Sequence, residues 1–154
     1  MQFFEDLPVG RVDVDEAVSY TVTEAEIIEV GTRWDPQPFH IDPVAAAQSP
    51  FGGLVASSVH LLAIAVATGA KTSMDNPVAA VSALGFDKMR LHAPARPGDV
   101  LCNRSEVVEA RPSGSQPHLG VVRNRVELWN ERAELIFSFE AAYLVARRPE
   151  GHGA

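Results

Sequence analysis

The longest apolar run of the chain, residues 54–70, constrains the fold more than any other segment. Apart from small hydroxyl residues, only His60 and Gly69 interrupt it. A helix that is apolar on every face is normally buried in the middle of a fold. The run is also shorter than the roughly 20 residues that a membrane-spanning helix needs. We therefore expect it to form the long central helix of a globular domain.

From residue 76 onward the sequence predicts only strands and turns. Arg123, Arg125 and Glu127 alternate with apolar residues, which is typical of a strand with one solvent-facing side. Strands joined by short turns pair in antiparallel fashion, and a sheet supplied with one apolar helix must wrap around it. The expected fold class is therefore α+β, with an antiparallel sheet around a long central helix. The expected strands cover residues 78–90, 100–109, 122–129 and 135–145.

The residues before the apolar run predict a strand and then a helix. Thr23 and Glu26 have the spacing of a capping box, which predicts a helix over residues 24–32. Pro36 and Pro38 prevent this helix from continuing. The preceding strand alternates between apolar and polar residues, and its expected inward-facing residues are Val12, Val14, Val18, Tyr20 and Val22.

Asp35 and His40 form a candidate catalytic pair just past the end of this helix. Pro36 and Pro38 stiffen the connection between them, so the backbone fixes the directions of both side chains. A carboxylate beside an imidazole can hold one water molecule and move its proton near neutral pH. The alternative interpretation is that Asp35 caps the preceding turn and His40 packs its ring under a loop.

A metal site is the weaker interpretation of the same region. His40, Asp42 and His60 could together supply three ligands, but metal-binding motifs have more regular spacing. Asp42 directly precedes Pro43, which suits it to cap a short helix. His60 lies within the apolar run, where we expect a structural core histidine bonded to a carbonyl. No metal is therefore expected.

The Gly52-Gly53 pair precedes the long helix and suggests an anion-binding helix start. Free N–H groups at a helix N-terminus can stabilise an oxyanion such as a thioester enolate. Ser57 and Ser58 follow the glycines, and they could act as caps or donors. The alternatives are an ordinary tight turn and two small residues that permit close packing.

Charge and cysteine content exclude several other classes of protein. The 13 basic and 20 acidic residues give a net charge of −7, which argues against nucleic-acid and anionic-membrane partners. Cys102 is the only cysteine, so an internal disulfide is excluded. The N-terminus lacks the basic region of a signal peptide, so we expect a cytoplasmic protein. One domain is expected over residues 1–147, followed by a polar tail, residues 148–154, without ordered contacts.

The segment DPQPFH, residues 35–40, resembles the D-x-N-x-x-H motif of the MaoC-like acyl dehydratases, which include the R-specific enoyl-CoA hydratases. SPFGGLVAS (residues 49–57), FEDLPVG (residues 4–10) and RPGD (residues 96–99) extend the resemblance over about residues 3–147. Gln37 stands in the place of the motif asparagine. Ser57-Ser58 stands where hydratases often have His-Gly.

The resemblance implies a single hotdog fold and a homodimer, or a higher even oligomer, with the active site near the subunit interface. It implies that Asp35 and His40 hold the water that adds to a trans-2-enoyl-CoA thioester, giving a 3-hydroxyacyl-CoA. The backbone N–H of Ser58 or Ser57 would hold the thioester oxygen. CoA is part of the substrate, and no cofactor is implied. The alternatives are a hotdog acyl-CoA thioesterase and a non-catalytic acyl-CoA-binding or partner subunit.

Substrate contacts are expected from two sets of residues. Apolar loop and helix positions should line the acyl pocket, and the candidates are Phe39, Phe51, Gly53 and Leu54. The phosphates of CoA need positive partners, and the candidates are Lys88, Arg90 and Arg96. The alternative for these three cations is that they only solvate an exposed face.

Overall fold

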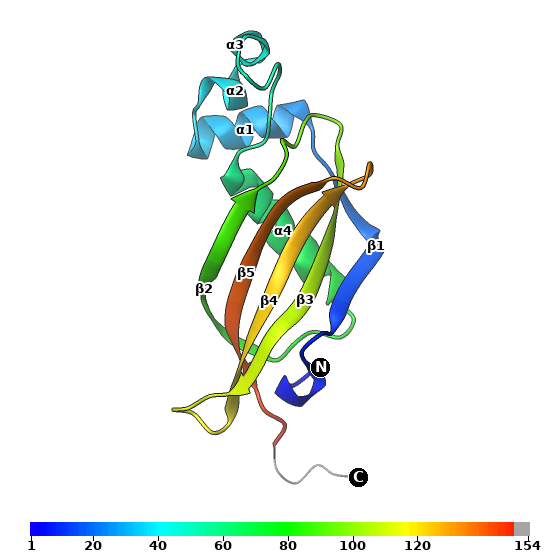
Figure 1. The fold of residues 1–154 in the computed structure, drawn as a ribbon, viewed down its shortest axis with the longest axis vertical. Coiled ribbons are helices and arrows are strands. Elements are labelled where there is room, and N and C mark those ends of the chain that lie inside the picture. Colours follow the sequence, from blue (N-terminus) through cyan, green and yellow to red (C-terminus); the bar gives the residue numbers. More distant parts are fainter. Residues whose placement is uncertain (150–154) are drawn as a thin grey trace.

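Five antiparallel strands form one curved sheet along a single long helix, α4 (Ser58–Thr72), in the computed structural model (Figure 1). The structure describes residues 1–149. The order of strands in the sheet is β1-β3-β4-β5-β2. This arrangement confirms the expected α+β class. The strands are β1 (Val12–Thr21), β2 (Ala80–Leu91), β3 (Val100–Pro112), β4 (Leu119–Asn130) and β5 (Leu135–Ala146).

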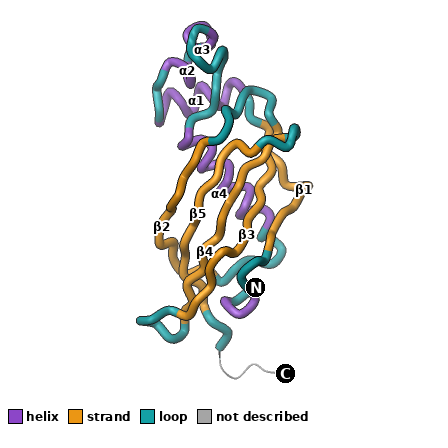
Figure 2. The backbone as a smooth tube through the Cα atoms, viewed as in Figure 1, coloured by secondary structure: helices purple, strands orange, loops and turns teal. Residues whose placement is uncertain are grey.

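Three helices gather beyond one end of the sheet, near the start of α4 (Figure 2). They are α1 (Glu24–Trp34), α2 (Pro38–Ile41) and α3 (Pro43–Ala47), and a short 3₁₀ helix, η1 (Phe4–Asp6), lies near the N-terminus. Thr23 caps α1 as predicted, since its hydroxyl accepts a hydrogen bond from the Glu26 N–H at 3.2 Å. The Glu26 carboxylate does not complete a capping box; it accepts from the Tyr20 hydroxyl instead. Helix α1 is thereby tied to β1.

Helix α4 forms the centre of the main core, but the sheet covers only part of its surface. Leu61, Ile64 and Ala65 are buried against apolar residues of the strands. The expectation that α4 is buried on every face is wrong, because Val59 is 46% exposed and Val66 is 52% exposed. One five-stranded sheet cannot enclose a helix on all sides. The side of α4 that carries these valines therefore remains apolar and accessible.

The start of α4 also differs from the sequence prediction. The helix begins at Ser58. Residues 54–57 belong to no helix or strand, and Ser57, the N-cap, has extended backbone angles. The Val55 N–H donates to the carbonyl of Phe39 at 3.1 Å, and the Ala56 N–H donates to the carbonyl of Ala95 at 2.9 Å. These backbone bonds hold the segment against α2 and the chain after β2. Gly52-Gly53 therefore does not lie at the helix N-terminus.

The first half of β1 faces the opposite side from the one predicted. Val14 pairs with Arg104 and Ser19 pairs with Cys102, so five steps along β1 match two along β3. A bulge of this kind changes which residues face the helix. Val12 and Val14 are exposed, and Asp13 lies on the helix side. The predicted inward position of these two valines is wrong.

Strand β2 is an edge strand with an unusually apolar surface. All twelve of its residues are exposed, and they include five large apolar side chains, which are Val81, Leu84, Phe86, Met89 and Leu91. Its hydrogen-bonding partner is β5, on one side only. An exposed apolar edge favours pairing with another chain.

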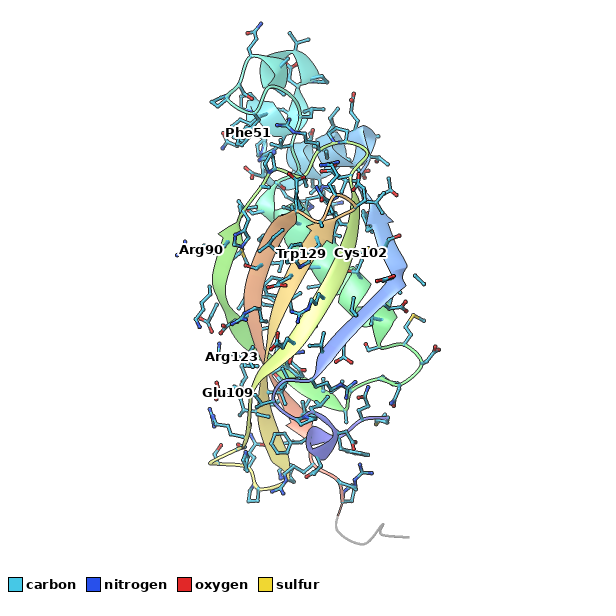
Figure 3. The ribbon with its side chains drawn as sticks, turned by 45° about the vertical axis from the view of Figure 1, so that its right-hand side comes forward. Phe51, Arg90, Cys102, Glu109, Arg123 and Trp129 are labelled. Atoms are coloured by element: carbon cyan, nitrogen blue, oxygen red, sulfur yellow. The ribbon has the colours of Figure 1, made fainter. Side chains whose placement is uncertain are left out.

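The sheet face opposite α4 is charged, as predicted from the alternation in β4. Arg123 lies beside Glu109 on this face (Figure 3), with an Nε–Oε2 distance of 3.4 Å, and it also pairs with Asp87.

Near the end of the described chain, Arg147 pairs with Glu5 and Arg148 pairs with Asp6. The expectation of no ordered contacts in the tail is therefore wrong at Arg148, and residues 150–154 of the predicted tail lie outside the described part.

Candidate active site

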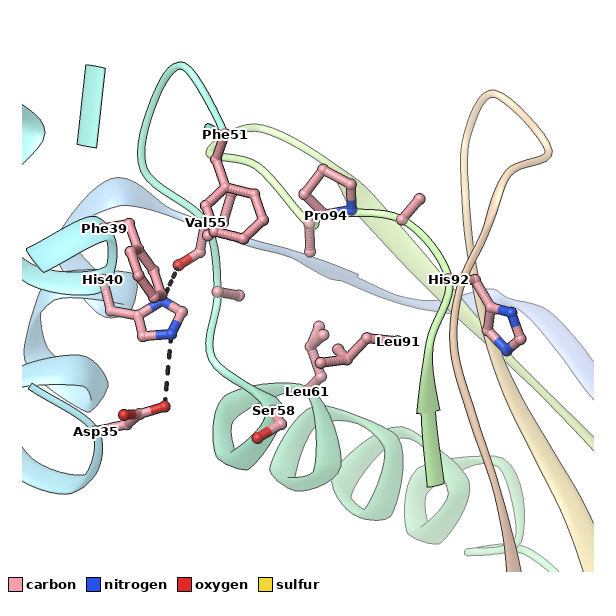
Figure 4. Close-up of a pocket in the computed structure, with 13 residues that line it drawn as sticks. Asp35, Phe39, His40, Phe51, Val55, Ser58, Leu61, Leu91, His92 and Pro94 are labelled. Carbon is pink, nitrogen blue, oxygen red and sulfur yellow. Dashed lines mark hydrogen bonds and ion pairs between the residues drawn. The ribbon is translucent and has the colours of Figure 1, made fainter. Parts of the chain in front are cut away.

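Asp35 and His40 lie together in the structure, although they belong to different helices. The Asp35 N–H closes the last turn of α1 by donating to the Gly31 carbonyl at 2.9 Å, and His40 belongs to α2. The distance between Asp35 Oδ2 and His40 Nε2 is 3.5 Å (Figure 4). The sequence predicted only a connection stiffened by two prolines here. Pro38 instead starts a helical turn, because its fixed φ suits the first position of a helix.

The orientation of the His40 ring is set by a backbone carbonyl. The Val55 carbonyl oxygen lies 2.6 Å from His40 Nδ1. A carbonyl can only accept a hydrogen bond, so Nδ1 carries the proton in the neutral ring. Nε2 is then an acceptor that points toward the Asp35 carboxylate. The site therefore presents two proton acceptors to one small volume.

Gly31 permits the close approach of α1 and α2 that brings the pair together. A Cβ atom at position 31 would lie 2.7 Å from the His40 carbonyl oxygen and 2.9 Å from the His40 Cβ. Real Cβ atoms almost never approach other atoms so closely. The position of His40 relative to Asp35 therefore depends on the missing side chain of Gly31.

The pair opens into a cavity of about 330 Å³. Its wall is mostly apolar, and the Phe39 ring contacts the rings of both His40 and Phe51, with centroid distances of 4.6 and 5.1 Å. A mostly apolar cavity with a few convergent polar groups is typical of a ligand site. The lining residues are Asp35, Phe39, His40, Phe51, Val55, Ala56, Ser58, Leu61, Leu91, His92, Ala93, Pro94 and Ala95.

The start of α4 lies at this cavity. Ser57 is the N-cap, and its hydroxyl accepts from the His60 N–H at 3.2 Å. Ser58 occupies the first helical position and lines the cavity (Figure 4). The Ser58 N–H has no acceptor within the described chain. The positive end of the helix dipole reinforces this free donor.

The predicted substrate-binding residues occupy different places. Phe39 and Phe51 line the cavity, whereas Gly53 and Leu54 are absent from its wall and Leu54 is buried in the core. Arg96 donates to the Phe51 carbonyl at 2.7 Å and so holds the loop that carries this ring.

The two remaining predicted CoA contacts lie on β2, outside the cavity wall. Lys88 Nζ lies 3.0 Å from the Glu140 carboxylate. Arg90 projects outward from the strand (Figure 3). The role of these two cations and of Arg96 as phosphate contacts stays a prediction.

Two parts of the site were missed by sequence reasoning. The carbonyl of Val55 is a backbone group, so no side-chain pattern could reveal it. Residues 91–95 line the cavity at the end of β2, where the sequence indicated only the end of a strand and a turn. His92 turns its ring away from the cavity (Figure 4) and bonds the Ser138 hydroxyl at 2.8 Å.

A second buried histidine, His60, lies outside the cavity. Its Nε2 is 3.7 Å from Glu26 Oε2, and neither ring nitrogen has a hydrogen-bond partner in the described residues. The expected core position is therefore confirmed, but the expected carbonyl partner is absent. Burial lowers the pKa of His60, although Glu26 acts in the opposite direction. Burial and the Glu26 carboxylate raise the pKa of Tyr20 to about 12.

The remaining findings on the site concern Asp42, metal ions and membranes. Asp42 acts as the predicted N-cap, since its carboxylate accepts from the N–H groups of Val44 and Ala45 at 2.8 and 3.2 Å. Over residues 1–149, no three His, Cys, Asp or Glu side chains lie close enough together to hold a metal ion. No helix of this same part is long and apolar enough to cross a membrane.

Comparisons with known proteins bear on the family and the fold. The family model described as "MaoC like domain" matches residues 10–130. The crystal structure of a MaoC-like dehydratase from Rhodospirillum rubrum is 34% identical, with a TM-score of 0.84, and the match covers 97% of this chain and 99% of that chain. The chain is also 25% identical to the uncharacterized protein YdeM of Bacillus subtilis, over 93% of this chain and 98% of that protein.

A more distant structure shares the fold. It is the R-hydratase PhaJ1 from Pseudomonas aeruginosa, which is 20% identical with a TM-score of 0.72, over 95% of this chain and 86% of that one. A related protein from Mycobacterium tuberculosis, 21% identical with a TM-score of 0.72, is described as a double hotdog fold; the match covers 99% of this chain and 46% of that one. These neighbours confirm the predicted hotdog architecture.

Proposed function

Because the chain belongs to the MaoC-like family of hydratases and dehydratases, we propose that it adds water reversibly to a trans-2-enoyl-CoA thioester. The product is a 3-hydroxyacyl-CoA. The observation that carries the proposal is the 3.5 Å approach of Asp35 and His40 in a cavity that Ser58, at the start of α4, also lines. This arrangement supplies both proton transfer and charge stabilisation, which are the two requirements of such an addition.

The first requirement is activation of a water molecule. A water between Asp35 and His40 donates one hydrogen bond to each, because His40 Nε2 and the carboxylate are both acceptors. The water oxygen attacks C3 of the enoyl group while the pair takes up its proton. The pair then returns a proton to C2. The sum is the addition of one H–OH across the double bond.

The second requirement is stabilisation of the enolate that forms when C3 is attacked. Its negative charge lies largely on the thioester oxygen, which we place at the N–H of Ser58. The dipole of α4 adds to this interaction. Removing one donor of this kind costs about 3–4 kcal/mol in enzymes that depend on it. Backbone donation makes the role independent of the serine side chain, so the departure from His-Gly at this position is compatible with activity.

Substrate binding follows from the same cavity. The rings of Phe39 and Phe51 contact the part of the acyl group nearest the thioester. The CoA phosphates contact Lys88, Arg90 or Arg96. CoA is part of the substrate, and the reaction uses no cofactor. Gln37 precedes α2 as its N-cap residue without a side-chain cap bond, so its replacement of the motif asparagine leaves the His40–Val55 bond in place.

We expect the protein to act as a homodimer or a higher even oligomer. The exposed apolar edge of β2 and the exposed valines of α4 favour association with a second copy. Residue 91, at the end of β2, lines the cavity, so a partner on this edge would lie next to the site. Size-exclusion chromatography with light scattering tests this expectation.

The test of the reaction is an assay of the purified protein on a panel of trans-2-enoyl-CoAs. Hydration removes the absorbance of the enoyl thioester, and we expect this loss to depend on Asp35 and His40. Asp35→Asn keeps the shape of the side chain and removes its charge, so it is the decisive variant. Activity of Asp35→Asn equal to that of the wild type would overturn the proposal.

The products distinguish the alternatives. Release of free CoA thiol without a hydroxyacyl product would identify a thioesterase on the same scaffold. Binding of several enoyl-CoAs without turnover would identify a non-catalytic acyl-CoA-binding subunit.

A further inference from the structure

A second cavity of about 600 Å³ lies beyond the first along α4. It is bounded by the C-terminal half of the helix and by the inner face of the sheet. Ala65 lines it, and Leu61, one helical turn earlier, lines the first cavity. On β2, Phe86 lines the second cavity and Leu91 lines the first. The two cavities therefore follow one another between the same helix and the same strand.

The wall of the second cavity is polar where the sheet should be apolar. A sheet face that is covered by a helix normally carries apolar residues. Here Ser105 of β3, Asn124 of β4 and Tyr143 of β5 all face the cavity. Asn124 Nδ2 donates to the Ser105 hydroxyl at 2.9 Å, but the buried Asn124 Oδ1 has no partner among the described residues. An unsatisfied buried oxygen costs about 1–3 kcal/mol, so this part of the sheet face holds a polar group that the neighbouring described residues do not satisfy.

The charges in this wall neutralise each other. Arg11 Nη2 lies 2.8 Å from Asp13 Oδ1, and the Arg11 guanidinium also donates to the side chain of Gln2 and to the carbonyl of Asp6. The described residues that line the cavity include no further cation that could receive a carboxylate. Asp75, which is exposed at the wall, adds a negative charge. An uncharged hydrogen-bonding group therefore fits better than an ionised one.

Thr72, Ser73, Asn76 and Asn103 also line the cavity, and the other lining residues are apolar or glycine. The apolar part includes the T-shaped ring pair Phe86 and Phe139, with a centroid distance of 5.4 Å. A matching ligand has an apolar body and a polar end. Ser58, at the thioester site, and Gly69, in the second cavity, are eleven residues apart on α4. At about 1.5 Å per residue this is roughly 16 Å, which is the span of a long acyl chain.

We propose that the second cavity receives the distal end of the acyl chain, and that the favoured acyl groups carry an uncharged oxygen, a hydroxyl or a carbonyl, near that end. The Tyr143 and Ser105 hydroxyls and the Asn124 amide form its hydrogen-bonding partners. This inference rests on the proposed hydration reaction and defines its substrate class.

The test compares two substrates of equal length, trans-2-dodecenoyl-CoA and its 12-hydroxy derivative. The wild type should hydrate the hydroxylated substrate with a kcat/KM about tenfold higher, because one hydrogen bond to a neutral group is worth about that factor at most. Tyr143→Phe removes only the hydroxyl and should bring the two substrates to within about threefold of each other. Asn124→Leu, of similar size, should do the same. The 12-carboxy derivative should be the poorest of the three.

Tyr20→Phe is the matched control, because Tyr20 is the other tyrosine of the chain and bonds Glu26 away from the cavity. It should change all three substrates by the same factor. Equal rates for the plain and hydroxylated substrates in the wild type, with no effect of Tyr143→Phe on their ratio, would overturn this inference and leave the hydration reaction standing. Absence of hydration with every enoyl-CoA would overturn the reaction itself, and the inference with it.

Discussion

The described part of the chain, residues 1–149, contains two buried histidines, each beside a carboxylate, and only one of them has the surroundings of a catalyst. His40 is 7% exposed and lies 3.5 Å from Asp35, and His60 is 2% exposed and lies 3.7 Å from Glu26. Burial and the nearby charge are thus almost the same for both. Neither property distinguishes a catalytic pair from a structural one.

The two histidines differ in their partners and in their access. The Val55 carbonyl orients the ring of His40, whose other nitrogen faces a cavity. His60 has no hydrogen-bond partner for either nitrogen in the described residues, and it lines none of the three described cavities. A fixed tautomer and an open volume therefore separate the two sites. Substitutions can test this distinction in order of the size of their expected effects.

The largest expected effect is the difference between His40→Ala and His60→Leu in the hydration assay. His40→Ala removes the proposed base, and loss of general acid–base catalysis lowers rates by about 10²–10⁴-fold. His60→Leu removes two unsatisfied polar atoms from the core, so kcat/KM should change by less than about threefold. Equal losses in the two variants would show that burial beside a carboxylate, and not orientation, decides activity.

A smaller effect is expected from Gly31→Ala, which acts on the geometry of the His40 pair alone. Alanine favours a helix over glycine by about 1 kcal/mol. At position 31, however, the added Cβ would collide with the backbone of His40, so overpacking should lower the free energy of unfolding by about 1–3 kcal/mol. The shift of α2 should also lower kcat. Denaturant unfolding and the hydration assay measure the two effects.

Gly69→Ala is the matched control for this change, because both glycines lie in helices. Its Cβ would lie 3.5 Å from Asn103 Nδ2, an ordinary contact distance. The helix propensity then prevails, and Gly69→Ala should stabilise the protein. Stabilisation by both alanine variants would show that Gly31 is not required for the approach of α1 to α2.

The comparison of the two histidines also shows how far the sequence can predict this site. Asp35 and His40 were identified from their residue types and from the two prolines between them. The helical turn α2 was missed because Pro38 was interpreted only as a helix breaker, although proline also starts helices. The carbonyl that orients His40 has no side-chain signature. Sequence therefore indicated which side chains meet, and not what holds them.

In the fold, too, hydrophobic periodicity predicts the main elements, whereas backbone bonds between distant segments determine where an element begins and which way its residues face. The sheet and the central helix follow from hydrophobic patterns, but the first residues of the apolar run are compatible with both a strand and a helix. Backbone bonds from Val55 and Ala56 to distant segments keep residues 54–57 out of the helix. The bulge in β1, which turns Val12 and Val14 outward, likewise depends on the pairing with β3.

Ser57→Ala tests the helix start that lies between the two histidine sites. The Ser57 hydroxyl caps α4 by accepting from the His60 N–H, and loss of such a cap costs about 1 kcal/mol. We expect this loss in the free energy of unfolding from urea titration. The Ser58 N–H remains, so the fold-change in kcat should be far smaller than that of His40→Ala. Ser57→Asp, which retains a capping oxygen, should restore stability. A loss of stability in Ser57→Asp equal to that in Ser57→Ala would contradict the capping role.

The smallest expected effect is the dependence of stability on pH that His60 introduces. Burial holds its folded-state pKa below the ordinary value of 6.5, against the opposing attraction of Glu26. Below about pH 6.5 the unfolded chain therefore binds more protons at this position than the folded chain does. The free energy of unfolding therefore falls as the pH falls through this range. A difference of one bound proton between the two states would give a slope of about 1.4 kcal/mol per pH unit, and His60 contributes a part of that slope.

His60→Leu should remove this contribution, so the variant should lose less stability than the wild type between pH 7 and pH 5. Urea unfolding at several pH values measures the difference. Parallel stability curves for the two proteins would contradict the assignment, and would mean that Glu26 stabilises the protonated ring as fully as water does. The Val55 carbonyl that orients His40 and the cavity beside it would then be the features that separate the two sites.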